Sequence, residues 1–354
     1  MPHGYATMSV ASILAETAHR MPDNVALIFN GQEIAYRDLW DQTRSYAGAL
    51  RDLGVGPGDK VALMIPNVPD FPRAYYGVLA LGAVVVPIHA LLKATEIEYV
   101  LRDSGSKVLI CAAPLLTEGA KGAALAGVDT LSVLVPDDLV EQLPFPRLED
   151  LAASAEPVAT YVPRHPIDTA TILYTSGTTG KPKGAEGCHF SLVEQVNVLL
   201  NGTLDLEPTD RILGCLPLFH TFGQTCVMNM GFRAGAAVVL VPKFDPATAL
   251  QLLNAHQCTV MTGVPTMYIA LLEAAKTNPE RPPLRYGMSG GAAIPVAVIE
   301  RMKEVYGIDV HEGYGLTETS PVASFNHRGR PTRVGTVGQP IWGVDVEIAD
   351  PELD

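Results

Sequence analysis

The sequence predicts an α/β protein built from two similar subdomains layered from βαβ units, followed by the start of a β-structure. Three observations predict this class. Short apolar runs rich in β-branched residues alternate with helical patterns along most of the chain. A polar, proline-containing connection over residues 148–168 divides the alternation into two halves of similar size. From Val334 onward, frequent glycines and a period-two alternation replace the helical patterns.

The first half, residues 1–165, has the spacing of strand–helix–strand units with a parallel sheet. A helix is expected over residues 70–81. A second helix is expected to begin at a capping box formed by Thr95 and Glu98. The expected strands of this subdomain cover residues 60–66, 83–88 and 107–112.

The second half, residues 166–333, repeats the alternation. A strand is expected over residues 170–175, and a helix from about Ser191 to Asn201. Further strand-like runs, separated by helical patterns, lie within residues 211–219, 236–242, 258–265, 284–291 and 309–315. Residues 334–354 form a third, β-rich segment.

Composition narrows the classes of function. The 354 residues carry a net charge of −13, which repels nucleic acids and anionic membranes. The five cysteines are scattered and form no CxxC pair, which fits a reducing cytoplasm better than a zinc site or a disulfide framework. We expect no signal peptide, and no transmembrane segment because the most apolar run, residues 74–88, is shorter than the roughly 20 residues that a span needs.

A glycine-rich loop, "YTSGTTGKPKG" at residues 174–184, follows a predicted buried strand. Its backbone amides, its hydroxyls and the ammonium groups of Lys181 and Lys183 suit phosphate oxygens. The loop does not match the Walker pattern, because Gly177 and Gly180 are too close and Pro182 occupies the place of the metal-binding hydroxyl. A flexible linker without a ligand is the alternative, but the paired lysines after a buried strand favour nucleotide phosphates.

Four motifs in register resemble the adenylate-forming superfamily of acyl-CoA synthetases, luciferases and peptide-synthetase adenylation domains. They are the glycine loop, "LPLFHTFG" (216–223), "SGGAAIP" (289–295) and "HEGYGLTET" (311–319). The resemblance implies the large N-terminal domain of that family. It also implies ATP-dependent conversion of a carboxylic acid to an acyl-adenylate and then to an acyl-CoA, with ATP, Mg²⁺ and coenzyme A taking part.

The resemblance also assigns residues to roles. It implies phosphate contacts from Thr175, Ser176, Gly177, Thr178, Thr179, Gly180 and Lys183. It implies adenine contacts from Gly291, Ala292, Glu312, Gly313 and Tyr314. It implies that His220, Thr317 and Glu318 act at the reacting groups, with Glu318 as the magnesium ligand. Outside these motifs His220 would read as a structural histidine, Tyr314 as core packing and Glu318 as a surface charge; His311 is expected to be structural.

The acyl pocket implied by the resemblance is lined by the strand at residues 286–290 together with Phe222, Gly223, Val264, Thr266 and Met267. Relatives that activate malonate carry an arginine just after the tyrosine of this region, whereas this chain has Ile269 and Ala270 after Tyr268. A dicarboxylate would then lack a counter-charge, and an unpaired buried charge is costly. The sequence therefore favours a medium- or long-chain fatty acid or an aryl acid.

Family members normally continue through a β-barrel and a mobile C-terminal domain, so we expect residues 334–354 to begin a truncated β-barrel. Residues 1–354 alone are then expected to be inactive or very weakly active. Two alternatives remain beside the acyl-CoA synthetase. One is an adenylating enzyme that loads a carrier-protein thiol, and the other is a catalytically silent nucleotide-binding fragment. A homodimer is compatible with the sequence.

Overall fold

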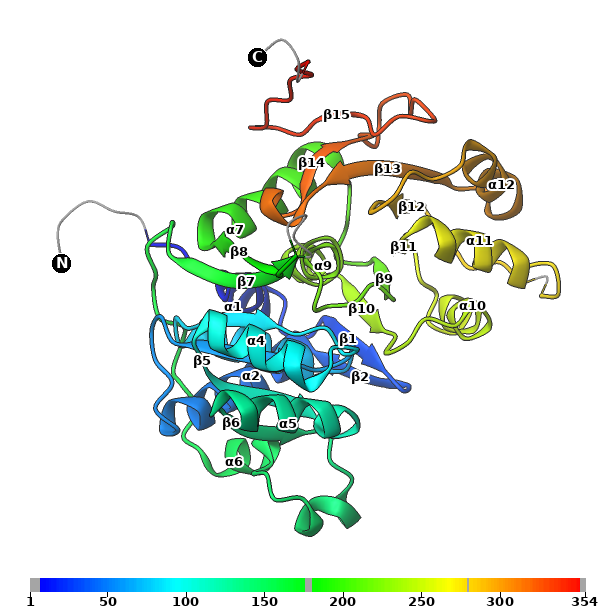
Figure 1. The fold of residues 1–354 in the computed structure, drawn as a ribbon. Coiled ribbons are helices and arrows are strands. Elements are labelled where there is room, and N and C mark those ends of the chain that lie inside the picture. The colour runs from blue at the N-terminus through cyan, green and yellow to red at the C-terminus, as the bar shows by residue number, and fades with distance from the viewer. Residues whose placement is uncertain (1–6, 176–179, 279, 351–354) are drawn as a thin grey trace.

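The computed structural model describes residues 7–175, 180–278 and 280–350. It confirms the predicted α/β class: two sheets, both rich in parallel strands, pack with helices on their faces (Figure 1). Ser176 to Thr179 of the glycine loop lie outside the described residues. Within the described residues, no helix is both long and apolar enough to cross a membrane.

The first sheet has six strands in the order β6-β5-β3-β4-β7-β8. All neighbours are parallel except β8, which runs antiparallel to β7. The strands are β3 (Lys60–Met64), β4 (Val84–Pro87), β5 (Ser106–Ala112), β6 (Asp129–Val133), β7 (Thr169–Thr175) and β8 (Lys183–Cys188).

The second sheet has nine strands in the order β15-β14-β13-β12-β11-β9-β10-β1-β2. Its centre is parallel, while β2, β14 and β15 pair antiparallel at the two edges. The strands are β1 (Val25–Phe29), β2 (Gln32–Ala35), β9 (Arg211–Gly214), β10 (Ala237–Leu240), β11 (Val260–Gly263), β12 (Tyr286–Ser289), β13 (Asp309–Gly315), β14 (Val322–Phe325) and β15 (Gln339–Pro340).

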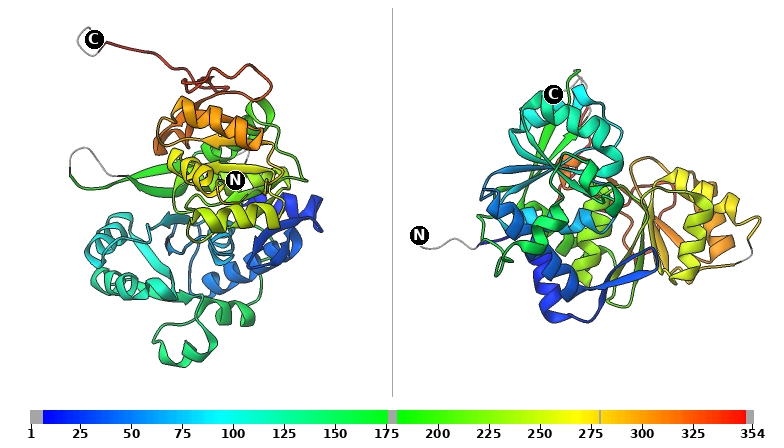
Figure 2. Two further views of the ribbon diagram at one scale, coloured as in Figure 1. Left: turned by 90° about the vertical axis from the view of Figure 1, so that its right-hand side faces the viewer. Right: turned by 90° about the horizontal axis from the view of Figure 1, so that it is seen from below.

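Helices connect the strands and cover the sheets (Figure 2). The α-helices are α1 (Ser12–Arg20), α2 (Tyr36–Asp52), α3 (Asp70–Ala80), α4 (Ala94–Ser104), α5 (Leu116–Ala126), α6 (Leu148–Ser154), α7 (His189–Val198), α8 (Thr221–Gly223), α9 (Met230–Ala234), α10 (Pro246–Ala255), α11 (Pro265–Ala274) and α12 (Val296–Tyr306). Short 3-10 or π turns are η1 (Ala113–Leu115), η2 (Asp137–Gln142), η3 (Leu199–Thr203), η4 (Gln224–Asn229) and η5 (Thr317–Thr319).

The hydrophobic core follows from strand alternation. On β3, Val61 and Leu63 belong to the largest core cluster, which also contains side chains of the second sheet such as Tyr286. The intervening Ala62 and Met64 belong to a separate cluster beneath α4 and α5. Because successive side chains of a strand point to opposite faces, one face of the six-stranded sheet packs toward the rest of the molecule and the other packs under its own helices.

Three local expectations need correction. Helix α4 begins at Ala94, and the carboxylate of Glu96 accepts the Lys93 backbone N–H at 2.8 Å, so Glu96 closes this helix start instead of a Thr95–Glu98 box. The connection over residues 148–168 contains α6. The glycine loop is followed by β8, so it joins two antiparallel strands before the helix begins.

Each sheet contains strands from both sides of the expected subdomain boundary at residue 165. Strands β1 and β2, from the first half of the chain, belong to the nine-stranded sheet. Strands β7 and β8, from the second half, belong to the six-stranded sheet. The division at residue 165 therefore does not coincide with the division between the sheets. In the β-rich segment after Val334, the described residues contain the two-residue strand β15.

Candidate active site

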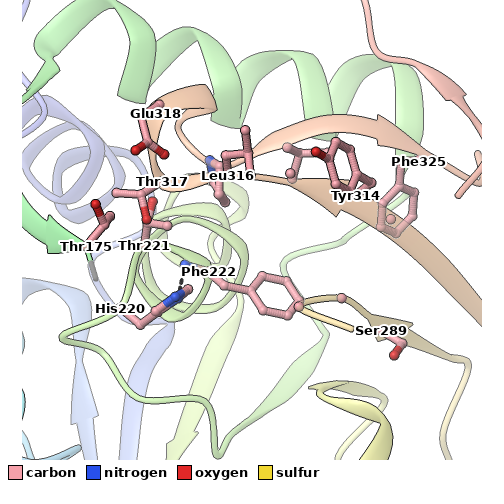
Figure 3. A pocket seen from close by; sticks show the side chains of 16 residues that line it. Thr175, His220, Thr221, Phe222, Ser289, Tyr314, Leu316, Thr317, Glu318 and Phe325 are labelled. Atoms are coloured by element: carbon pink, nitrogen blue, oxygen red, sulfur yellow. Dashed lines mark hydrogen bonds between the residues drawn. The ribbon is translucent and has the colours of Figure 1, made fainter. Parts of the chain in front are cut away.

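A pocket of about 360 Å³ lies where strands of both sheets end. Its walls come from the carboxyl ends of β7, β12 and β13, from η5 and β14, and from the α8 region that follows β9. Ligands of open parallel sheets bind beyond the carboxyl ends of the strands, so this is the expected place for a site. In Figure 3, Thr175, Thr317 and Glu318 gather at one end of the view, and the rings of Phe222, Tyr314 and Phe325 at the other.

The pocket brings together eight of the residues predicted from the sequence: Thr175, His220, Phe222, Gly291, Gly313, Tyr314, Thr317 and Glu318. Eight other predicted residues are described but are not part of its lining: Gly180, Lys183, Ala292, Glu312, Gly223, Val264, Thr266 and Met267. The remaining four, Ser176, Gly177, Thr178 and Thr179, lie outside the described residues.

His220 caps the short helix α8. Its Nδ1 accepts the Phe222 backbone N–H at 3.1 Å, so in the neutral ring the proton is on Nε2. The residue keeps an exposed edge at the pocket. The protein around the rest of the ring lowers the pKa of His220 below its ordinary value, and His89 lowers this pKa further. Loss of hydration disfavours the charged form, so the ring is held as a neutral donor.

The loop after β12 has a backbone that suits glycine. Gly291 has φ of +81°, a left-handed conformation that other residues adopt only at a cost. A side chain at Gly290 would meet the Phe222 ring at 3.2 Å, which shows that the ring packs directly on this backbone. Val264 reaches the same loop from behind, 3.6 Å from the ideal Cβ position of Gly291. Ala292 is exposed beside it.

The end of β13 presents an exposed aromatic ring beside a buried carboxylate. Tyr314 is 52% exposed and lines the pocket, so its ring is open to a ligand instead of packed in the core. Glu312 is only 4% exposed, and its carboxylate accepts the Ile294 backbone N–H at 3.1 Å. Glu312 therefore ties the loop after β12 to β13 and supports the pocket from outside its lining.

Thr317 and Glu318 lie on η5, directly after β13. The exposed carboxylate of Glu318 has no hydrogen bond or ion pair within the part of the chain that the structure describes. It shares the pocket with hydroxyl groups of Thr175 and Thr317. No group of three or more His, Cys, Asp or Glu residues that could hold a metal occurs among the described residues. The donor set therefore fits a metal ion that takes most of its ligands from phosphates and water, as Mg²⁺ usually does.

Lys183 is placed by the β7–β8 hairpin. It pairs with Thr175 across the antiparallel ladder, and Thr175 lines the pocket. Directly opposite residues in such a ladder project from the same face, about 5 Å apart at Cβ. The exposed Lys183 ammonium makes no ion pair or hydrogen bond with any described residue. Among the described residues it is therefore an unpaired cation, opposite a residue that lines the pocket.

Several predicted acyl-pocket residues have packing roles. Gly223 allows close approach, because a Cβ there would lie 2.2 Å from the Pro217 carbonyl oxygen. Met267 packs between two core clusters, and Thr266 is exposed. The position used to argue against a dicarboxylate is also remote: Ile269 is 42% exposed and does not line the pocket. The nature of the acid must therefore be argued from the pocket lining itself.

Ser289 and Gly290 of the lining belong to the expected strand at 286–290. Sequence reasoning missed six lining residues: Thr221, Gly315, Leu316, Pro321, Val322 and Phe325. Four of these lie in or next to the recognised motifs. The other two, Val322 and Phe325, come from β14, a strand that the sequence pattern did not predict. His89 was also missed; its ring packs on Phe219 at 4.4 Å between centroids, and its charge acts on His220 to lower the pKa of that residue.

Comparison with known proteins agrees with this geometry. Residues 14–354 match the family described as AMP-binding enzyme. The chain is 32% identical to a long-chain-fatty-acid–CoA ligase of Bacillus subtilis over 97% of the chain and 66% of the relative. It is 32% identical to a feruloyl-CoA synthase of Amycolatopsis over 94% of the chain and 65% of the relative. The chain thus spans about two thirds of the length of these relatives.

A solved structure gives the same result. The crystal structure of an anthranilate CoA ligase with anthranoyl-AMP superposes with a TM-score of 0.91 at 26% identity, over 98% of this chain and 67% of the other. Two parallel-rich sheets with a pocket at their strand ends define an α/β ligand-binding domain. The chain belongs to the AMP-binding enzyme family, and the resemblance drawn from the four motifs is confirmed.

Proposed function

We propose that the protein activates a carboxylic acid with ATP and transfers the acyl group to the thiol of coenzyme A. One observation carries this proposal. A single pocket combines an exposed aromatic ring (Tyr314), an unpaired carboxylate (Glu318) and a neutral histidine (His220). These are the groups needed to stack a base, to meet a phosphate-bound cation and to donate to a carboxylate oxygen. The family match and the relatives, which are named as CoA ligases or synthases, support the same reading.

In the first step a carboxylate oxygen of the acid attacks the α-phosphorus of ATP. A new P–O bond forms, the bond to the β-phosphate oxygen breaks, and pyrophosphate leaves. Nε2–H of His220 orients the attacking carboxylate, and the Thr175 and Thr317 hydroxyls with the Lys183 ammonium hold phosphate oxygens. These groups act by positioning and by stabilising charge that develops on oxygen.

In the second step the coenzyme A thiol, losing its proton to solvent, attacks the acyl carbon. The carbon–oxygen bond to the phosphate breaks, and AMP leaves. We propose that Glu318 holds Mg²⁺, which when bound neutralises charge on the phosphates. Gly291 and Tyr314 would contact the adenine, with Ala292 at the rim of that loop and Glu312 and Gly313 behind it.

We propose that the acid has an uncharged tail, aliphatic or aromatic. The described lining contains aromatic and aliphatic groups (Phe222, Phe325 and Val322 among them) and no lysine or arginine. A second carboxylate in this pocket would be unpaired, and such a charge is costly to bury. Each methylene of an alkyl tail instead gains about 0.8 kcal/mol on burial.

Acid-dependent exchange of pyrophosphate into ATP tests the proposal on the complete gene product. We expect exchange with octanoate or an aryl acid, and at least tenfold less with malonate, since several methylenes at about 0.8 kcal/mol each exceed the 1.4 kcal/mol that a factor of ten requires. Preference for malonate would contradict the tail assignment. Exchange followed by transfer to a carrier-protein thiol instead of coenzyme A would contradict the acceptor. ATP binding without exchange would leave only a nucleotide-binding protein.

A further inference from the structure

Helix α4 holds the strand pair that flanks the glycine loop. The phenol of Tyr99 donates to the Pro182 carbonyl oxygen at 2.9 Å, just before β8 begins. One turn further along α4, the carboxylate of Asp103 accepts a hydrogen bond at 2.7 Å from the phenol of Tyr174 on β7. The two tyrosine rings also meet edge to face, with centroids 6.3 Å apart. Both strands of the hairpin are therefore bound to one face of one helix.

The two lysines of the loop lie in different surroundings. The Lys181 ammonium lies 5.8 Å from the centre of the Tyr99 ring, within the range of a cation–π contact. Lys183 makes no ion pair or hydrogen bond in the described part of the structure. Lys181 thus belongs to the contact with α4, and Lys183 is left for a ligand.

The Tyr174–Asp103 hydrogen bond is maintained over the physiological range of pH. Burial and the neighbouring Asp103 carboxylate raise the pKa of Tyr174 well above its ordinary value. The phenol remains protonated and remains the donor. A hydrogen bond to an ionised acceptor is stronger than one between neutral groups, so this is the firmer of the two anchors.

The other side of the hairpin reaches the pocket. Strand β8 packs against η5, which carries Thr317 and Glu318. Thr175, at the end of β7, lines the pocket and pairs with Lys183. The hairpin therefore connects α4 on one side with the phosphate end of the pocket on the other.

We propose that Tyr99 and Asp103 are positioning residues for the phosphate site. They touch no reacting atom; they fix the hairpin so that Thr175 and Lys183 stand opposite Thr317 and Glu318. This inference rests on the proposed function, since it assigns the site to ATP phosphates. It predicts that disturbing α4 weakens the use of ATP while leaving the use of the acid intact.

Single-group variants separate positioning from folding. Tyr99→Phe removes one anchor, and Asp103→Asn removes the negative charge that strengthens the other; both keep the side-chain shape. We expect each to raise KM for ATP about fivefold, the effect expected when one hydrogen bond is lost or loses its charge assistance. The kcat should stay within twofold and KM for the acid should be unchanged. Tyr306→Phe, on the remote helix α12, is the matched control. The Tyr306 phenol likewise donates to a backbone carbonyl, that of Leu271 on α11, at 3.3 Å. It should leave both KM values unchanged.

The lysines provide a second arm. Lys181→Met should reproduce Tyr99→Phe, whereas Lys183→Met should weaken ATP binding by at least a further factor of about ten, the cost of losing a charge-assisted contact. Hydrogen exchange of the β7 and β8 amides, measured without ligand, should be faster in Tyr99→Phe and Asp103→Asn than in Tyr306→Phe.

The outcomes are distinguishable. If Lys183→Met raises KM for ATP while Tyr99→Phe and Asp103→Asn do not, the positioning role is refuted and the proposed function stands. If the parent protein shows no ATP-dependent exchange with any acid, the proposed function fails. The amide-exchange comparison then still decides the anchoring, and unchanged exchange in both α4 variants would overturn it.

Discussion

Acid should destabilise the fold through one buried histidine, His189, at the start of α7. The residue is fully buried, and its Nδ1 accepts the Val10 backbone N–H at 3.1 Å. Its Nε2 is buried and has no hydrogen-bond partner among the described residues. Protonation would place a charge in this site and would turn the accepting nitrogen into a donor facing a donor. Burial, aided by Arg164, accordingly lowers the pKa of His189 from 6.5 to about 4.

The sign and size of the change in the free energy of unfolding follow from the linkage between protonation and folding. The unfolded chain binds the proton at the ordinary histidine pKa, whereas the folded chain binds it only near pH 4. Stability that is present at neutral pH is therefore lost as the pH falls from the unfolded pKa toward the folded one. A shift of this size corresponds to about 3 kcal/mol in full, and to about 2 kcal/mol between about pH 7.5 and pH 5.

Urea unfolding of His189→Asn provides the assay. The Asn side-chain oxygen can still accept the Val10 N–H but cannot be protonated, so the variant should lose about 2 kcal/mol less than the parent between about pH 7.5 and pH 5. The variant His19→Asn, at an exposed histidine in the last turn of α1, is the control. Equal losses of stability in the parent and in His189→Asn would refute the reasoning, because other titrating groups are common to both proteins.

Three further substitutions test the site and its support. Glu318→Gln should lower adenylation by about 100-fold, the effect of removing one charge-stabilising group. Its stability should be unchanged, because the carboxylate has no partner among the described residues. Activity like that of the exposed control Glu300→Gln would disprove the metal assignment. Gly291→Ala should cost about 1–2 kcal/mol in urea unfolding because of its positive φ; a neutral effect would show that the loop relaxes. Tyr268→Phe should cost about 1–2 kcal/mol, since its buried phenol lies 2.9 and 2.8 Å from two strand carbonyls; an unchanged unfolding midpoint would argue against those bonds.

The strands that the sequence predicts well are those buried on both faces. The apolar runs at residues 60–66 and 107–112 form β3 and β5, because parallel strands covered on both sides need continuous apolar residues. Strand β8, "KGAEGC", has no such run and lies at the edge of its sheet. Its conformation depends on pairing with β7, a tertiary contact that composition does not record.

The assignment of each strand to one of the two sheets also could not be predicted from sequence patterns. The connection before β7 is polar and reads as a domain linker, yet β7 returns to pair with β4 of the first sheet. The order of strands is fixed by which faces can be buried together, and the largest core cluster contains side chains from both halves of the chain. A domain boundary drawn from local composition cannot detect that the two halves of the chain share one core.

At the site, the sequence motifs located the residues that line the pocket better than the residues that pack behind them. Tyr314, Glu318 and His220 line the pocket as expected, whereas the predicted apolar residues Met267 and Gly223 serve packing. Polar or aromatic residues that remain unpaired at strand ends carry a chemical signal in the sequence. An apolar residue gives none, because lining a pocket and filling a core require the same side chain.

The meeting of two sheets explains why this site needs both halves of the chain. Thr175 ends a strand of the six-stranded sheet, while Ser289 and Gly315 end strands of the nine-stranded sheet. A ligand in the pocket therefore contacts two layers whose relative position is fixed by their shared core. Substitutions at that core, such as Tyr286→Leu, should then affect ligand binding without touching the ligand. Since packed cores respond to volume changes by shifting whole elements, the geometry of the site depends on the packing between the sheets as much as on the residues that line it.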